Sequence, residues 1–303
     1  MVKRIVLSAV LMMVSTLWVA AQMLVGSYNI RYKNTEDSIN GNAWANRCQV
    51  ICDQVNFMSP DIFGAQEVLY SQLSDLIQGL DGYNYIGVGR DDGKTQGEYA
   101  AIFYKEDRIR LLDQGNFWLS ETPDKPGLGW DAACVRICTW GKFKHLKLKK
   151  KFFYFNLHMD HVGKVARREA AKLVVQKIRE IAQGAMVILT GDFNVDQNNE
   201  IYRIFTDSGI LKDSYLATRL RFAENGTFNS FKTDFFTKSR IDHVFVSPSA
   251  VVDAYGVLTD SYWTPDTTSV EKQKGSDAPQ EISFSRYIRR QVSDHYPVFV
   301  KLL

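Results

Sequence analysis

The stretch AMVILTGDFNVD, Ala185–Asp196, carries the strongest structural signal in this chain of 303 residues. Met186–Leu189 is apolar without polar alternation, which is typical of a strand buried on both faces. Gly191 then permits a turn, and Asp192 and Asn194 point to the same side of an extended chain. A buried carboxylate beside a carboxamide is costly unless a hydrated cation, a water nucleophile or a phosphate fills the space before them. An Asx turn that closes the strand is the alternative interpretation of this stretch alone.

The same construction, a strand that delivers polar side chains at its end, recurs along the chain. Strands are predicted over Met23–Ile30, Asp61–Ala65, Tyr83–Val88, Tyr99–Tyr104, Phe117–Ser120, Ala133–Trp140, Phe152–Leu157, Ile241–Val246 and Val292–Lys301. The polar residues at or near strand ends are Asn29, Glu67, Glu98, His158, Asp192, Asn194, Asp242, Asp294 and His295.

Helices interleave with these strands without a domain break, which indicates a layered α/β body in one domain over residues 22–303. Apolar residues at helical spacing predict helices over Trp44–Phe57, Val68–Leu80, Lys164–Ile181 and Asn199–Ser208. We expect a loop over 33–42 and a hairpin with solvated lysines over 142–151. The polar segment 260–282 is too long for a simple connection and is expected to be a mobile insertion or lid.

Residues 1–21 have the layout of a secretory signal peptide. Lys3 and Arg4 precede an apolar run, and small residues follow it before Gln22. No later stretch is long and apolar enough to cross a bilayer, so we expect an exported chain without a transmembrane segment in its mature form. The net charge of +3 neither demands a nucleic-acid partner nor excludes an anionic substrate.

The four cysteines form two pairs with a spacing of four: Cys48 and Cys52 on one face of a helix, and Cys134 and Cys138 on one face of a strand. Buried thiols or a disulfide are favoured over a metal site, because Cys is commonly a core residue and an exported protein can oxidise its thiols.

The strand-end residues favour metal-assisted hydrolysis. None of them is a Ser or Cys with an adjacent base, and the chain contains no phosphate-binding Gly-rich loop, GxSxG elbow or HExxH helix. Oxygen ligands suit Mg²⁺, with Mn²⁺ or Ca²⁺ as alternatives, better than zinc.

Six blocks resemble, in order, the endonuclease/exonuclease/phosphatase superfamily, the deoxyribonuclease I-like group. They are SYNIR (27–31), AQE (65–67), NLHMDH (156–161), TGDFN (190–194), SRIDHVFV (239–246) and SDHYPV (293–298). The resemblance implies a four-layer α/β sandwich, in which two packed, mostly antiparallel sheets are flanked by helices and the blocks share one cleft.

The resemblance also implies roles for the strand-end residues. Glu67 would be the principal metal ligand, supported by Asn29 and Asp294. Asp192 would orient or deprotonate the attacking water, and Asn194 would hold that water or a phosphoryl oxygen. His295 would contact the phosphate while Asp242 fixes its tautomer, and Glu98 would do the same for His158. Whether Asp192 or a His is the base stays open.

Three arginines, Arg31, Arg90 and Arg167, are the substrate-side candidates, because Arg gives bidentate contacts to phosphate. A surface ion pair is the alternative for each of them. His161 has a simpler interpretation as a cap for the following helix, and neither His145 nor His243 is assigned a role.

Arg31 departs from the family pattern, because several nucleases carry a second acidic residue there. This weakens the case for a second metal and favours small phosphorylated substrates or phosphodiesters. The predicted function is an exported, metal-dependent phosphohydrolase that cleaves a phosphodiester or phosphomonoester. A secreted nuclease is the alternative, and a non-catalytic binding protein on the same fold is less favoured. The partners implied are a phosphorylated small molecule, a phospholipid head group or nucleic acid, with no stable protein partner.

Overall fold

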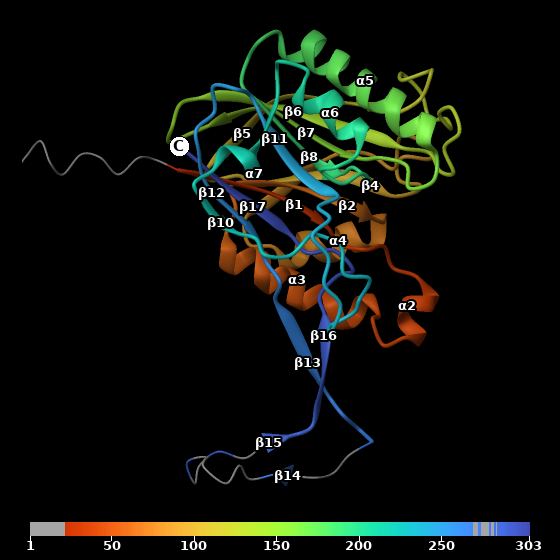
Figure 1. The fold of residues 1–303 in the computed structure, drawn as a ribbon, viewed down its shortest axis with the longest axis vertical. Helices are drawn as coiled ribbons and strands as arrows, with labels where there is room; N and C mark the ends of the chain where they lie inside the picture. The colour runs from red at the N-terminus through yellow and green to blue at the C-terminus, as the bar shows by residue number, and fades with distance from the viewer. Residues whose placement is uncertain (1–21, 269–271, 274–278, 280–281, 283) are drawn as a thin grey trace, which may run out of the picture.

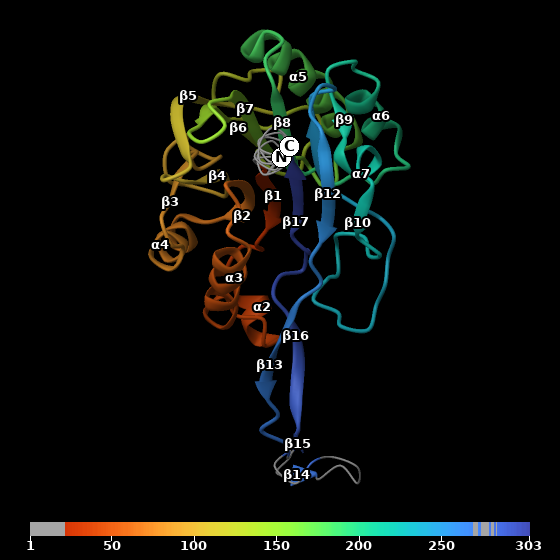
Figure 2. The ribbon, with the colours of Figure 1, turned by 90° about the vertical axis from the view of Figure 1, so that its left-hand side faces the viewer.

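Two β-sheets pack face to face, and helices cover the outer face of each (Figure 1). The computed structural model describes residues 22–268, 272–273, 279, 282 and 284–303. The predicted signal segment 1–21 and part of the 260–282 insertion lie outside the described residues. Helices α3 and α4 lie on one side of the molecule, and α5 and α6 lie on the other (Figure 2). The four predicted layers and the mostly antiparallel pairing are therefore confirmed.

The larger sheet has the strand order β10 (Leu220–Phe222), β12 (Val252–Val257), β17 (Val298–Leu302), β1 (Met23–Asn29), β2 (Ile62–Val68), β4 (Tyr99–Lys105) and β3 (Tyr83–Ile86). The smaller sheet has the order β5 (Ile109–Trp118), β6 (Ile137–His145), β7 (Lys151–His158), β8 (Val187–Asp192), β11 (Asp242–Val246) and β9 (Lys212–Asp213). The helices are α2 (Thr35–Ile39), α3 (Trp44–Met58), α4 (Tyr70–Gly79), α5 (Lys164–Ala182), α6 (Glu200–Thr206) and α7 (Ser214–Ala217).

The strands central to the fold follow the predicted pattern. β8 is buried along its whole length, and its Gly191 has a φ of 156°. A Cβ at this position would collide with the carbonyl oxygen of Leu157, so only glycine fits where the strand delivers Asp192. β8 pairs in parallel with β7 and antiparallel with β11, and this register places His158 and Asp242 on either side of Asp192.

Buried polar side chains join the two sheets directly beneath the strand ends. Gln66 on β2 donates to the Asn156 side chain on β7, with a distance of 2.6 Å between the two atoms. Asn156 in turn donates to the backbone carbonyls of Ala65 and Ala101 at 2.9 Å. The Tyr154 hydroxyl donates to the carbonyl of Gly26 and accepts from the amide of Gly64. These bonds fix the relative position of the two sheets where the predicted site lies.

Several boundaries differ from the sequence prediction. The expected loop 33–42 contains α2, which forms because the Asn34 side chain caps it by accepting from the amide of Asp37. The last strand begins at Val298 rather than Val292, because Asp294 and Tyr296 pair with residues 227–230. β12 was missed, and most of β5, an edge strand with exposed residues in its middle, was missed as well.

Part of the expected insertion forms a two-stranded ribbon of β13 (Ser261–Pro265) and β16 (Tyr287–Gln291), which projects from the body (Figure 1). β14 (Lys272–Gln273) pairs with β15 (Phe284–Ser285) further out. The lysine-rich hairpin is present as the turn from β6 into β7. The part of the chain that the structure describes contains no helix long and apolar enough to span a membrane.

We predict that Tyr154→Phe lowers the free energy of unfolding by about 1–3 kcal/mol, because it removes two buried hydrogen bonds to backbone groups. Urea unfolding with an unchanged m-value measures this loss. The matched control is Tyr85→Phe on β3, where a change within about 0.5 kcal/mol is expected. An equal loss in the two variants would contradict a bridging role for Tyr154.

Candidate active site

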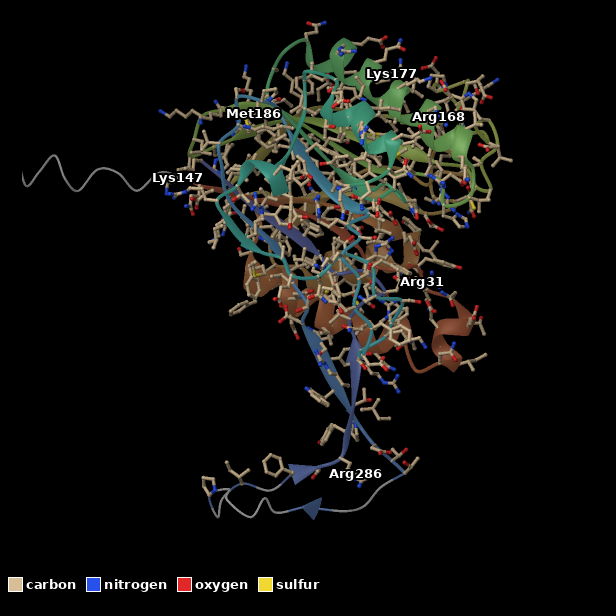
Figure 3. All side chains as sticks on the ribbon, in the orientation of Figure 1. Arg31, Lys147, Arg168, Lys177, Met186 and Arg286 are labelled. Atoms are coloured by element: carbon tan, nitrogen blue, oxygen red, sulfur yellow. The ribbon has the colours of Figure 1, made fainter. Side chains whose placement is uncertain are left out.

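Strand ends from both sheets deliver their polar side chains into one cleft of about 1060 Å³. The predicted residues that line it are Arg31, Glu67, Arg90, Glu98, His158, Asp192, Asn194, Asp294 and His295. Asn29 and Asp242 are buried directly behind this lining. Figure 3 labels Arg31 near α2 and Arg168 beside α5 in the upper part of the view.

Asn29 bonds the acidic groups of the two sheets to each other. Its amide nitrogen donates to Glu67 at 3.0 Å and to Asp192 at 3.1 Å. Its carbonyl oxygen accepts from the backbone amide of Arg31 at 3.0 Å, and the second Glu67 oxygen accepts from the amide of Tyr32 at 3.1 Å. Asn29 is fully buried, so it holds the two carboxylates at a fixed separation.

Three residues of the site have left-handed backbone conformations, with φ of 59° at Arg31, 62° at Glu67 and 50° at Asn194. This region is uncommon for residues other than glycine and costs free energy. At Glu67 it coincides with an irregularity in the pairing of β2 with β4, between Ala65 and Val68. Such irregularities redirect a side chain next to active sites, as the Glu67 side chain is redirected here.

His295 is bonded to Asp242 and held as a cation. Its Nδ1 lies 2.8 Å from Asp242, and its Nε2 lies 3.7 Å from Asp192. Burial lowers the pKa of His295, but Asp242, Asp192 and Asp294 outweigh burial and raise it well above its usual value. The geometry therefore matches the predicted pair of His295 with Asp242.

Carboxylates crowd one another around Asp192. Burial, with the charges of Asp242 and Glu67, raises the pKa of Asp192 to about 7 against the opposing effect of His295. Burial and Glu67 likewise raise the pKa of Asp294. Oxygen or nitrogen atoms of Glu67, His158 and Asp192 come within 4.8 Å of one another. A divalent cation would relieve this repulsion, so the residues fit a hard cation with oxygen ligands.

Glu98 and His158 are not paired in the way the sequence predicted. Glu98 accepts two hydrogen bonds from Arg90, at 2.7 and 3.0 Å, because a guanidinium matches a carboxylate bidentately. His158 Nδ1 lies 3.7 Å from Glu98 and has no hydrogen-bond partner among the residues that the structure describes. Burial, then Arg136 and Arg90, lower the pKa of His158 well below its usual value. His158 is therefore neutral, and Arg90 is engaged with Glu98.

The other two arginine candidates are also engaged within the protein. Arg31 bonds to Asp37 at 2.8 Å and lies 3.5 Å from Asp294, while part of its side chain remains exposed in the cleft. Arg167 does not line the cleft, because its buried guanidinium donates to the backbone carbonyl of Asp160 at 3.0 Å. Arg31 stays a substrate-side candidate, and Arg167 instead supports the backbone beside His158.

Sequence reasoning missed two buried arginines. Arg136 precedes β6, is 5% exposed and lines the cleft. Arg47 on α3 is fully buried and donates to the backbone carbonyls of Ile30 and Val292, next to Asn29 and Ser293. The sequence did contain a signal that Arg47 is buried, because Arg47 lies on the predicted apolar face of the helix Trp44–Phe57.

All four cysteines are free thiols, so the disulfide alternative is not realised in this structure. Cys52 and Cys138 are buried in the core, and Cys134 lines the cleft. His161 does not cap the helix that follows it but also lines the cleft.

A model of the Endonuclease/Exonuclease/phosphatase family matches residues 26–295. An endonuclease/exonuclease/phosphatase family protein from Bacteroides thetaiotaomicron is 48% identical, with a TM-score of 0.86 over 93% of this chain and 98% of that one. A mannosyl-6-phosphatase from Bacteroides thetaiotaomicron VPI-5482 is also 48% identical, with a TM-score of 0.85 over 93% and 99%. An uncharacterised protein of Acanthamoeba polyphaga mimivirus is 26% identical over 85% of this chain and 91% of its own length.

We predict that Asp242→Asn lowers the pKa of His295 towards its usual value, because the variant removes the largest favourable charge beside it. The raised pKa means that His295 contributes stability below about pH 6.5 and loses that contribution as pH rises through its folded value. An NMR titration of the imidazole nitrogens without divalent cations measures the change. Asp81→Asn, an exposed change, is the control, and an unchanged His295 titration in Asp242→Asn would contradict the pairing.

We predict that Asp160→Asn destabilises the fold by about 1–3 kcal/mol at pH 7, because Asp160 accepts from several backbone amides. Burial raises its pKa, but these bonds outweigh burial and lower the pKa to about 2. The contribution is present above about pH 4 and is lost as pH falls towards 2. Thermal unfolding of both proteins should therefore converge at low pH, and a constant gap down to pH 2 would contradict this.

Proposed function

Because the chain belongs to the endonuclease/exonuclease/phosphatase family, we propose that it is a divalent-metal-dependent phosphohydrolase acting on a phosphorylated small molecule. Members of this family hydrolyse phosphoester bonds. The observation that carries the proposal is the convergence of Glu67, Asp192 and Asp294 with a protonated His295 in one cleft. These residues combine oxygen ligands for a metal cation with a protonated imidazole that would face the phosphoryl oxygens.

Glu67 would hold the metal, with Asn29 and Asp294 beside it. Mg²⁺ is the cation that this set of oxygen donors favours, and Mn²⁺ or Ca²⁺ are alternatives. The bound cation would supply Lewis-acid stabilisation of charge on the phosphoryl oxygens. The raised pKa values of Asp192 and Asp294 support this assignment, because burial and then neighbouring carboxylates make the charged forms costly without a cation.

The remaining residues would orient and stabilise the reacting groups. Asp192 would orient an attacking water or accept its proton, because its carboxylate lines the cleft beside Glu67 and His295. Protonated His295, fixed by Asp242, would stabilise the phosphoryl oxygens as they gain charge. Asn194 would hold a phosphoryl oxygen, with its amide nitrogen positioned by a 3.0 Å bond to the carbonyl of Met159. Neutral His158, 3.5 Å from Asp192, can accept or donate a hydrogen bond.

A phosphorylated sugar is the substrate class that we favour. The similarity to a mannosyl-6-phosphatase extends over 93% of this chain at 48% identity. The outer wall of the cleft carries Glu36, Asn40, Asn42 and Ser230, which are donors and acceptors suited to sugar hydroxyls.

A nuclease is the second candidate. Lys232, Arg289 and Arg290 line the outer cleft, and they form no ion pair with a carboxylate among the residues that the structure describes. Unpaired cations of this kind suit a nucleic-acid backbone or a phospholipid head group. A non-catalytic binding protein is less favoured, because Glu67, Asp192, Asn194, Asp242 and His295 are all present and assembled.

We also propose that the protein is exported, on the evidence of residues 1–21. N-terminal sequencing of the mature protein tests this, with Gln22 as the expected first residue. An intact N-terminus at Met1 would contradict it.

We predict that Glu67→Gln and His295→Ala each reduce kcat/KM by about 100-fold or more, because each removes a group that stabilises transition-state charge. The assay is hydrolysis of p-nitrophenyl phosphate and bis(p-nitrophenyl) phosphate with Mg²⁺ and with a chelator. Glu106→Gln, a surface change, is the control. Equal rates with Mg²⁺ and with chelator, or full activity in both variants, would reject the mechanism.

A substrate panel separates the two candidates. Sugar phosphates, inositol phosphates, sphingomyelin, plasmid DNA and RNA are compared at equal enzyme concentration. The proposal expects the highest kcat/KM on a sugar phosphate. Faster cleavage of DNA or RNA would favour the nuclease.

A further inference from the structure

Arg136 is a buried cation that faces the cleft on the His158 side. Its side chain is 5% exposed, and its guanidinium bonds to Asp160 through Nε at 3.4 Å and to His161 through Nη2 at 2.9 Å. Nη1 has no hydrogen bond to a described residue and is not among the fully enclosed atoms without partners. Because Arg136 lines the cleft, this nitrogen is available to a ligand there.

Asp160 positions Arg136 by bonding two loops together. One of its oxygens accepts from the amides of Val162 and Gly163, at 2.9 and 2.7 Å. The other accepts from Ala133 and Cys134, at 3.1 and 3.2 Å, as well as from Arg136. With its acceptors used in this way, Asp160 is a positioning residue and not a ligand for a substrate.

The contact with Arg136 fixes the tautomer of His161. A guanidinium only donates, so His161 Nδ1 must accept, and the ring then carries its proton on Nε2. His161 is exposed and lines the same cleft. Arg136 and His161 therefore present two hydrogen-bond donors side by side.

This pair lies next to the reacting centre. Met159 donates its amide to the carbonyl of Asp192 at 2.9 Å, and its carbonyl accepts from the Asn194 side chain at 3.0 Å. Asp160 and His161 follow directly in the chain. The turn that carries the donor pair is thus bonded to the strand end that carries Asp192 and Asn194.

A phosphomonoester has three terminal phosphoryl oxygens, and a phosphodiester has two. In the proposed function, a cation held at Glu67 would contact one of these oxygens, and Asn194 with His295 would contact a second. We propose that Arg136 and His161 form the subsite for the third oxygen and so select phosphomonoesters over phosphodiesters. This inference rests on the proposed phosphohydrolase function and adds the residues that choose between the two ester classes.

The test compares one monoester with one diester, p-nitrophenyl phosphate and bis(p-nitrophenyl) phosphate, in Arg136→Gln, Arg136→Lys and His161→Ala. Both esters release the same leaving group. The expected result is a loss of about tenfold or more in kcat/KM on the monoester and less than threefold on the diester. The bond from Arg136 is charge-assisted, and the bond from His161 depends on the contact of His161 with Arg136. Arg136→Lys keeps the charge but lacks the planar guanidinium that contacts Asp160 and His161 together, so an intermediate loss of kcat/KM on the monoester is expected.

Matched controls are Arg168→Gln on the outer face of α5 and Val162→Ala beside His161, both exposed and outside the cleft lining. Both should retain the wild-type ratio of the two rates. If Arg136→Gln fails to fold, the exposed His161→Ala and the charge-retaining Arg136→Lys carry the test. Equal losses on the two esters, no loss on the monoester, or a wild-type enzyme that prefers the diester would overturn the proposal.

Binding of inorganic phosphate gives a readout that needs no turnover. Isothermal titration should show phosphate binding about tenfold weaker in Arg136→Gln and His161→Ala, with dimethyl phosphate binding unchanged. Absence of metal-dependent hydrolysis in the wild type would reject the proposed function, while this titration would still decide the subsite. Unchanged phosphate affinity in both variants would overturn the subsite alone.

Discussion

The amide of Asn29 is the interaction on which the site depends. It is fully buried, and it donates to Glu67 within its own sheet and to Asp192 in the opposite sheet. Buried carboxylates are costly unless donors or cations satisfy them, and here they also repel one another. One neutral donor shared between two carboxylates holds them close without neutralising them. The negative charge that remains suits the divalent cation of the proposed function, and the same charge raises the pKa of His295.

The interface between the sheets makes this arrangement rigid. Gln66 and Asn156 are adjacent to the catalytic candidates in sequence, since each lies one or two positions from Glu67 or His158. Their side chains bond across the sheets and to strand backbone instead of facing the cleft. A shift of one sheet relative to the other would break these bonds and separate Glu67 from Asp192. These buried hydrogen bonds between the sheets therefore fix the distance between the candidate catalytic groups.

Residue pattern predicted a layered α/β body because the core strands and α5 are long or strongly periodic, as on the face of Ala166, Ala170, Val174 and Ile178, while the four layers were implied by the family resemblance. It failed at β5, whose exposed edge carries little hydrophobic signal. The expected pairing of Glu98 with His158 failed because Arg90, eight residues away in sequence, competes for the same carboxylate with a better-matched geometry. Arg136 was overlooked although it lies within the predicted apolar strand Ala133–Trp140, because that position alone does not show what the side chain contacts.

The sequence by itself determined most of the core strands and the longer helices and the identity of the acidic and imidazole groups, because period and residue type are local properties of the chain. Only the tertiary structure decided which of those groups touch. The pairing of β8 with β7 and β11 places His158, Asp192 and Asp242 side by side. The loop before β17 brings His295 into contact with Asp242, from which it is separated by 53 positions in the sequence. The tertiary structure also decided the ionisation states of these groups, because their pKa values depend on burial and on charges from distant segments. The arginines show the difference most plainly: Arg136 lay in a predicted strand and Arg167 in a predicted helix, and the fold alone placed Arg136 in the cleft lining and Arg167 outside it.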